Sequence, residues 1–400
     1  MKIALISLSI PTYNNRGAAS ALPYHLIKGM GSDAQFEAWS YNINHIPAKD
    51  IREVEQALGV KIHLLAMPSW SKWMFRWHLA PLRILLRYPY LRYCKLNEQA
   101  IGAISEYHPD KVWIYGEEIA HLAQHFSQLP CIATMPDCES MYYHRLLGKD
   151  FPTTKASSIM RYAYAFWQYR GMERALQTPN TLYHFVGKAD EAFFREICPQ
   201  AKTVFLPHPL YAHRDKQIRF HRPKVKLLFA GRYDFYCSHG SDALLQAMTK
   251  HSATLAAHYE VTFLGKGWEA WTQQLKNAGW TAQHITFADD YIAELQQHDI
   301  QVNAIDVGTG TKGKVLDAIS NGLLELGTPF ALENIATKHD EGCLLYHTPS
   351  EAITMLEDVP QRIEHYEAIA EQGRKDVLAA HDASKVAHTL FQHGVINQRG

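Results

Sequence analysis

The residues best suited to chemistry lie in one glycine-rich segment, Asp306–Gly322, which reads DVGTGTKGKVLDAISNG. A Gly/Thr-rich loop leads into a predicted helix, and Lys312 and Lys314 stand in its first turns. Backbone N–H groups at a helix start, the positive end of the helix dipole and two ammonium groups together form an anion site. Asp317 follows Lys314 by three residues on nearly the same face, where a carboxylate can accept hydrogen bonds from ribose hydroxyls. The segment predicts a nucleotide diphosphate site; an ordinary βα turn with solvated lysines is the alternative.

A second cation follows another predicted strand, Lys226–Ala230. The strand leads into Gly231-Arg232, and Ser238-His239-Gly240-Ser241 opens the helix after it. A guanidinium at the carboxyl end of a parallel strand faces the edge where ligands bind, and it can hold phosphate oxygens bidentately. Surface pairing of Arg232 with Asp234 or Asp242 is the alternative.

Both segments resemble the donor-site motifs of the family 4 glycosyltransferases. The first is similar to Gly-x-Gly-x-Lys-x-Lys-Val-Leu-Glu-Ala, with Asp317 in place of the final glutamate. The upstream acid of the family's paired-glutamate motif falls at Thr309 and is missing, so we expect backbone amides of the loop to substitute for it. Glu325 and Glu333 also have seven residues between them, but they follow the helix and we interpret that spacing as coincidence.

In the second segment Arg232 matches the family's Gly-Arg, while His239 stands where the family has a lysine. The family also keeps a glycine in the first βα loop, where this chain has Gly17. The donor-binding residues that the resemblance implies are Gly17, Arg232, His239, Gly308, Thr309, Gly310, Thr311, Lys312, Lys314 and Asp317.

Acidic residues follow two strands of the first half of the chain. Glu117 comes after the predicted strand Lys111–Tyr115, and Asp137 comes after Cys131–Met135. Loops at the carboxyl edge of a parallel sheet face the ligand, so both acids are candidates for orienting an acceptor hydroxyl or for acting as general base. Capping of the following helices is the alternative, above all for Asp137.

The elements that must position these residues alternate between short apolar runs and helical patterns. Strands alternating with helices imply parallel, doubly wound sheets. The first strand is predicted at Ile3–Ile10, and the pattern restarts after Val204–Leu206 and Pro207-His208-Pro209. We therefore expect an α/β protein of two Rossmann-like domains facing a central cleft, which is the GT-B architecture that the resemblance also implies. The predicted domains are residues 1–206 for the acceptor, residues 207–380 for the donor, and a final helix in residues 381–400 that packs back on the first domain.

A basic aromatic segment at residues 69–95 reads SWSKWMFRWHLAPLRILLRYPYLRYCK and contains no acid. Residues 155–174 have a similar composition, with Arg161, Trp167 and Arg170 among them. Aromatic and cationic side chains on amphipathic helices suit an anionic membrane surface. Burial of the aromatic residues in the core, with a solvated cationic face, is the alternative.

Bulk composition excludes several classes of protein. Forty basic residues balance forty acidic ones among 400, so the chain has no net positive charge that would attract nucleic acid. Six cysteines without a CxxC pair indicate reduced thiols, and no Cys/His cluster predicts a metal site. The apolar run at the start is too short for a signal peptide. We expect a cytoplasmic protein, peripheral on the inner face of the cell membrane.

The resemblance implies a glycosyltransferase that uses a UDP- or GDP-sugar and a saccharide or lipid-linked acceptor. It also implies retention of anomeric configuration and no cofactor or metal, and we expect a role in polysaccharide or lipopolysaccharide synthesis. A GT-B epimerase and a non-catalytic two-lobed sugar-binding protein are the alternatives. Product analysis with the donor alone would separate the epimerase from a transferase.

Overall fold

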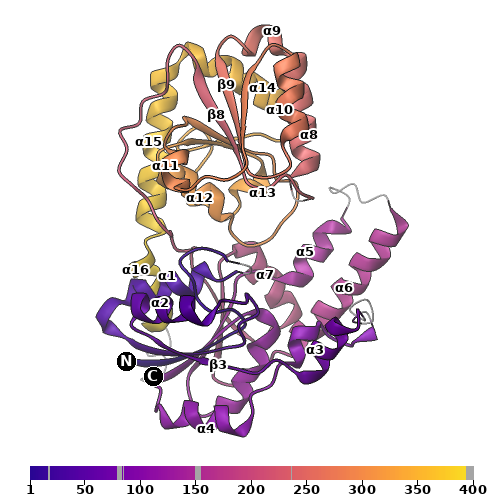
Figure 1. Ribbon diagram of the computed structural model, residues 1–400, viewed down its shortest axis with the longest axis vertical. Coiled ribbons are helices and arrows are strands. Elements are labelled where there is room, and N and C mark those ends of the chain that lie inside the picture. The colour runs from indigo at the N-terminus through magenta and orange to yellow at the C-terminus, as the bar shows by residue number, and fades with distance from the viewer. Residues whose placement is uncertain (17–18, 79–82, 84, 149–154, 236, 393–400) are drawn as a thin grey trace. The chain divides into compact units, whose positions relative to one another are not determined.

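The computed structural model describes residues 1–16, 19–78, 83, 85–148, 155–235 and 237–392, and it contains two compact units (Figure 1). Unit 1 comprises Met1–Tyr211 and the segment from Ala383 onward, whereas unit 2 comprises Ala212–Asp382. The chain thus leaves unit 1 five residues beyond the predicted boundary at residue 206 and returns to it for the last helix.

Unit 1 is built on a parallel sheet of seven strands in the order β3-β2-β1-β4-β5-β6-β7. The strands are β1 (Lys2–Ser7), β2 (Gln35–Ser40), β3 (Lys61–Leu64), β4 (Lys111–Tyr115), β5 (Cys131–Met135), β6 (Thr181–Phe185) and β7 (Lys202–Phe205). All residues of the central strands β4 and β5 are buried, because helices cover both faces of the sheet. The strand order reverses between β1 and β4.

Helices and 3-10 turns connect these strands. They are α1 (Ala21–Met30), η1 (Gly31–Asp33), α2 (Ala48–Leu58), α3 (Ser69–Arg76), η3 (Tyr90–Tyr93), α4 (Glu98–Glu106), η4 (Glu117–Phe126), α5 (Glu139–Leu146), α6 (Ala156–Arg174), α7 (Lys188–Ile197) and α16 (Ala383–Gln392). The last helix, α16, packs against α1, and its Phe391 contacts Phe36 and Trp113 in the core. Gly29 permits this approach, since a Cβ there would lie 2.4 Å from the carbonyl oxygen of Ala383.

Unit 2 has a parallel sheet of six strands in the order β10-β9-β8-β11-β12-β13, with the reversal between β8 and β11. The strands are β8 (Val225–Ala230), β9 (Tyr259–Leu264), β10 (Thr281–Ile285), β11 (Ile300–Asn303), β12 (Leu324–Gly327) and β13 (Leu344–Leu345). The helices are α8 (Ser238–Lys250), α9 (Ser252–Leu255), α10 (Glu269–Asn277), α11 (Tyr291–Leu295), α12 (Gly313–Ser320), α13 (Pro329–Leu332), α14 (Pro349–Asp358), η5 (Val359–Gln361) and α15 (Ile363–Ala380).

The predicted fold class, two α/β domains with parallel sheets, is confirmed. Two strand predictions need correction. The strand expected at Ile3–Ile10 ends at Ser7, because the backbone of Ile10 exchanges two 3.0 Å hydrogen bonds with the side chain of Asn44 instead of pairing in the sheet. The sequence also predicts a strand at His284–Phe287, but the strand lies at Thr281–Ile285, where an edge position tolerates its polar residues.

Candidate functional site

The loops after β8 and β11 carry the predicted donor residues of unit 2. Ligands of open parallel sheets bind at the carboxyl ends of the strands where the strand order reverses, and β8 and β11 are those strands here. Arg232 follows β8, and His239 lies in the first turn of α8. The loop after β11 leads directly into α12, which contains Lys314 and Asp317. The topology therefore gathers the two motifs at one sheet edge.

Lys314 lies at the carboxyl end of β8. Its Nζ donates a hydrogen bond to the carbonyl oxygen of Ala230 (3.3 Å), and a Cβ at Gly231 would lie 3.4 Å from the same nitrogen. Gly231 has φ +110°, a conformation that favours glycine. Burial lowers the pKa of Lys314, an effect that the nearby acids Glu325 and Asp234 oppose. The ammonium thus connects the start of α12 to the loop after β8.

The Gly/Thr-rich loop of residues 308–311 folds closely around Lys312. The Nζ of Lys312 donates to the carbonyl oxygen of Thr309 (2.6 Å), and a Cβ at Gly308 would lie 2.9 Å from its Cε. Gly310 has φ +61°, and its carbonyl oxygen accepts a hydrogen bond from Asn334 Nδ2 (2.9 Å). In this structure Lys312 supports the loop, whereas Lys314 reaches the neighbouring strand.

His239 contacts an acid whose partnership with it is not visible in the sequence. Its Nδ1 lies 2.5 Å from Oδ2 of Asp306, the acid that opens the glycine-rich segment. A Cβ at Gly240 would lie 2.1 Å from Asp306 Oδ1, so glycine is required for this approach. Burial raises the pKa of Asp306, and the hydrogen bond from His239 opposes that shift. An acid directly after a buried strand was the available signal, but its partner lies 67 residues away.

Arg232 is exposed at the end of β8. The alternative partner Asp242 accepts hydrogen bonds from Tyr233 (2.6 Å) and from Trp271 (2.8 Å) through one oxygen. Within the described ranges no ion pair joins Arg232 to Asp234 or Asp242. The guanidinium therefore stands at the sheet edge without the surface pairing that was the alternative interpretation.

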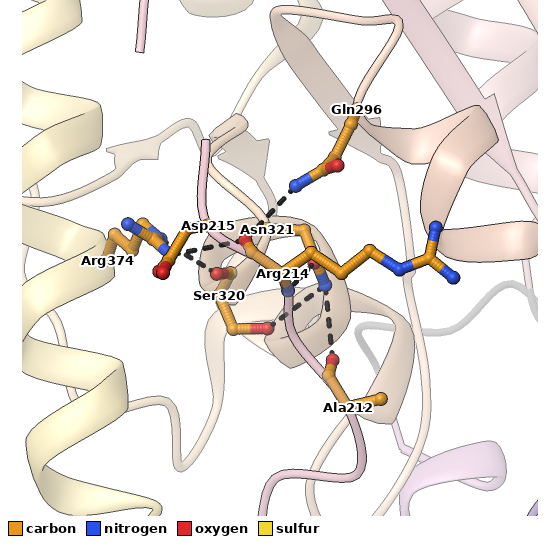
Figure 2. A network of polar contacts seen from close by, with 7 residues as sticks. All are labelled: Ala212, Arg214, Asp215, Gln296, Ser320, Asn321 and Arg374. Carbon is orange, nitrogen blue, oxygen red and sulfur yellow. Dashed lines mark hydrogen bonds and ion pairs between the residues drawn. The ribbon is translucent and has the colours of Figure 1, made fainter. Parts of the chain in front are cut away.

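The carboxyl end of α12 is fixed by the polar network that Figure 2 shows. The Asn321 side chain accepts a hydrogen bond from the backbone N–H of Arg214 (2.9 Å) and donates one to the carbonyl oxygen of Ala212 (3.2 Å). Arg374 of α15 donates to the carbonyl oxygens of Ser320 (3.0 Å) and Arg214 (3.2 Å). The first residues of unit 2 and α15 thus hold α12 at one end, which orients its lysine-bearing end.

Asp317 lies half-buried on α12. Burial raises the pKa of its carboxyl group to about 7. This acid therefore changes charge near neutral pH, unlike an exposed aspartate.

Glu325, whose spacing from Glu333 was interpreted as coincidence, lies close enough to Lys314 for their charges to interact. It lies in β12 with 0% of its surface exposed, and its Oε1 accepts a hydrogen bond from Asn303 Nδ2 (2.7 Å). Its Oε2 has no hydrogen-bond partner in the described part of the chain. Burial raises the pKa of Glu325 to about 8, and Lys314 is among the groups that oppose the shift. An acid inside an apolar strand was the signal available in the sequence.

In unit 1, Gly17 lies outside the described residues, whereas both candidate acids are described. Glu117 begins η4 and is only 4% exposed. Burial and, after it, neighbouring Glu173 raise the pKa of Glu117 well above its usual value. Asp137 is half-buried in the loop after β5. The structure places Glu117 inside the unit, so Asp137 is the more accessible of the two acids.

The start of α5 is held by three buried acids from other elements. Asp190 accepts a hydrogen bond from the N–H of Cys138 (2.9 Å), Glu173 from that of Ser140 (3.0 Å), and Glu117 from that of Glu139 (3.4 Å). Carboxylates are stabilising at a helix N-terminus, and here they come from distant positions in the sequence.

The basic aromatic segment is exposed in part. The side chains of Trp73 and Trp77 are 58% and 61% exposed, and Trp167 on α6 is 66% exposed. The segment is joined to α6 by hydrogen bonds from Tyr164 Oη (3.0 Å) and Gln168 Nε2 (2.5 Å) to the carbonyl oxygen of Leu86. Burial of the tryptophans in the core is therefore wrong for these three. No described helix combines the length and the apolarity needed to cross a lipid bilayer.

Comparison with known proteins gives one family model that matches part of the chain, and many solved structures with a similar fold. A family model described as glycosyl transferase-like matches residues 242–392, which include the glycine-rich loop and α12. No curated protein matches the chain by sequence.

Solved structures resemble the chain over nearly its whole length. HepE from Anabaena, determined in complex with UDP, has a TM-score of 0.62 at 11% identity and covers 98% of this chain and 99% of its own. Sucrose-phosphate synthase from Thermosynechococcus elongatus has a TM-score of 0.64 at 13% identity, with 98% of each chain covered. A glycosyltransferase from Rickettsia africae has a TM-score of 0.63 at 11% identity, with 99% of each covered. At these identities the likeness shows the fold.

Proposed function

We propose that the protein is a glycosyltransferase that moves a sugar from a UDP- or GDP-sugar to a saccharide or lipid-linked acceptor. The observation that carries the proposal is the contact of Lys314 with the end of β8, which brings the two donor-type motifs together at the strand-order reversal. The glycosyl transferase-like match over residues 242–392 supports transfer chemistry. The UDP complex of HepE supports a uridine nucleotide as the first choice of donor.

In the proposed reaction, the bond between the sugar and the diphosphate breaks through a transition state with oxocarbenium character. Negative charge then grows on the leaving diphosphate, and fixed cations lower the energy of that charge more than they lower the energy of the bound donor. Lys314, Arg232 and the amides of the 308–311 loop are suited to this task. Asp137 is the proposed group for orienting the acceptor hydroxyl. Retention of configuration and donor binding without a metal ion belong to the proposal through the resemblance.

Nucleotide binding tests the proposal directly. We expect one of UDP, GDP, ADP and CMP to raise the melting temperature of the full chain, because a ligand at 100 times its Kd stabilises the native state by about 2.7 kcal/mol. Differential scanning calorimetry measures the shift, and the Lys314→Met variant, which keeps side-chain length, is the matched control. The proposal fails if none of the four nucleotides stabilises the wild type. Release of free sugar or epimer from donor alone, with no transfer to any acceptor, would favour the epimerase.

We further propose that the enzyme works in polysaccharide or lipopolysaccharide synthesis at the cytoplasmic face of the cell membrane. The exposure of Trp73, Trp77 and Trp167 supports this role, because amphipathic aromatic side chains are favourable at the headgroup level of a bilayer. Arg76, Arg83 and Arg87 are exposed in the same segment, and no acid lies within residues 69–95. Each cation near an anionic surface contributes about 1 kcal/mol.

Vesicle binding provides the measurement. We expect the protein to co-sediment with vesicles that contain phosphatidylglycerol, to bind neutral phosphatidylcholine vesicles less, and to dissociate as salt rises. The double variant Trp73→Ala/Trp77→Ala should lower the partition coefficient at least tenfold. Phe287→Ala in unit 2 is the matched control, since Phe287 is an aromatic residue outside the segment and is more exposed than either tryptophan. Equal binding by both variants, or no preference for anionic vesicles, would contradict the proposal.

A further inference from the structure

Three buried side chains of unit 1 offer metal-ligand atoms to one another. Glu117 begins η4, Cys138 immediately precedes α5, and Glu173 lies in the last turn of α6. One ligand atom from each residue lies within 4.8 Å of the other two. The exposed fractions of the three residues are 4%, 0% and 0%. Buried acids beside a thiol are costly unless something compensates their charge.

The orientation of Glu173 is fixed by its neighbours. Its Oε1 accepts a hydrogen bond from the N–H of Ser140 (3.0 Å), and its Oε2 accepts one from the Ser140 hydroxyl group. The Sγ of Cys138 lies 3.5 Å from Oε1 of Glu173. Hydrogen bonds such as those from Ser140 to Glu173 orient the carboxylate ligands in metal sites.

The buried carboxyl group of Glu117 is poorly hydrogen-bonded. Its Oε2 accepts a long hydrogen bond from the N–H of Glu139 (3.4 Å), and its carboxyl group also lies within hydrogen-bonding reach of the Glu173 carboxyl group. Its Oε1 is fully buried, and no hydrogen-bond partner for it occurs among the described residues. A buried carboxylate oxygen without a hydrogen-bond donor is rare in folded proteins, and a bound cation is one way in which such an oxygen is satisfied.

We propose that Glu117, Cys138 and Glu173 bind a divalent cation of the Zn²⁺ class. A thiolate with two carboxylates suits Zn²⁺ or Co²⁺ and does not suit Mg²⁺ or Ca²⁺, which take oxygen ligands alone. Binding replaces the thiol proton and any carboxyl proton, which pass to solvent, and leaves one net negative charge on the cation and its three ligands. Tetrahedral Zn–S and Zn–O bonds of about 2.3 and 2.0 Å need ligand separations of about 3.3–3.5 Å, so small side-chain rotations from the observed spacing suffice.

The proposed cation would join three elements of unit 1, η4, α5 and α6. The cation would bind none of the donor residues named in unit 2, and it is compatible with sugar transfer that needs no metal at the diphosphate. Its failure would leave the proposed function untouched, because the nucleotide test reports on other residues.

Cobalt substitution gives a readout that surface histidines cannot imitate. The full chain, freed of metal with a chelator and then titrated with CoCl₂, should show a thiolate-to-cobalt charge-transfer absorption at one equivalent. ZnCl₂ should abolish this absorption by competition and should raise the melting temperature. Cys138→Ser should remove the band, and Glu117→Gln should weaken Co²⁺ binding at least tenfold, since even indirect ligand partners contribute that much.

Cys131→Ser is the matched control. Cys131 is buried in β5 of the same sheet, but its Sγ lies next to the carbonyl oxygens of Phe126 (3.7 Å) and Leu129 (3.6 Å). This variant should keep the charge-transfer band. The proposal is overturned if the wild type shows no band, or if the band survives in Cys138→Ser. Unchanged Co²⁺ affinity in a folded Glu117→Gln variant would also overturn it, because the two acids would then simply share a proton.

Discussion

Lys314→Ala is expected to lower the rate of sugar transfer by roughly two to three orders of magnitude, the usual effect of removing a group that stabilises transition-state charge. The reason is its position: the ammonium lies at the carboxyl end of β8, bonded to Ala230, on the helix that follows the glycine-rich loop. If it stabilises charge on the leaving diphosphate, kcat should fall together with kcat/KM. Steady-state kinetics with the nucleotide-sugar identified by calorimetry measures both.

Two companion variants separate charge from packing. Lys314→Met keeps most of the half-buried side chain and should lose nearly as much activity as Lys314→Ala. Arg232→Ala should also lose activity, whereas Lys250→Ala at the exposed end of α8 should not. If Lys314→Ala and Arg232→Ala both transfer sugar at near-normal rates, the donor site lies elsewhere.

Glu325→Gln is expected to stabilise the protein at alkaline pH and to leave its stability little changed at acidic pH. Burial raises the pKa of Glu325 to about 8 in the folded chain, whereas an unfolded glutamate has its ordinary value near 4.3. Between these values the folded state binds more protons than the unfolded state. The free energy of unfolding therefore falls as pH rises through this window and levels off above about 8. A neutral glutamine escapes this loss, which is at most about 5 kcal/mol for a shift of this size.

Urea unfolding at pH 5, 7 and 9 measures the effect. The difference between Glu325→Gln and wild type should grow with pH, because only the wild type must ionise a carboxyl group that has 0% of its surface exposed. Glu341→Gln, at an exposed position of the same unit, is the control and should show no such trend. A difference independent of pH would mean that Glu325 is fully ionised in the native state and compensated by Lys314.

Much of the fold could be predicted because local pattern decides it. The strands Lys111–Tyr115 and Cys131–Met135 are where the apolar runs put them, since central parallel strands are buried on both faces. The helical pattern after the first strand likewise predicts a helix at about Ala21–Met30, and α1 has these bounds. The bounds of strands at the edge of a sheet are harder to predict, as β10 shows, because their polar residues interrupt the apolar pattern that marks a buried strand.

The sequence could predict only those parts of the site whose residues lie together in one loop. The glycine-rich segment identifies Lys314 and Asp317 as candidates. The predicted strand before Arg232 indicates that this arginine lies at the carboxyl edge of the sheet. The pairing of His239 with Asp306 depends on two loops whose separation no local pattern measures. The approach of Glu117 to Glu173 depends in the same way on where α6 ends. Side chains joined by tertiary packing were therefore the part that sequence reasoning missed.

The return of the chain to unit 1 at Ala383 has a practical consequence for anyone who wishes to study the halves alone. A fragment that stops near residue 206 would lack Leu390 and Phe391, and the apolar faces of Leu26 and Trp113 would meet water. Such a fragment would be prone to aggregate. Excision of residues 212–382, with a short flexible bridge in their place, keeps the closing helix and gives a sounder route to an isolated first half.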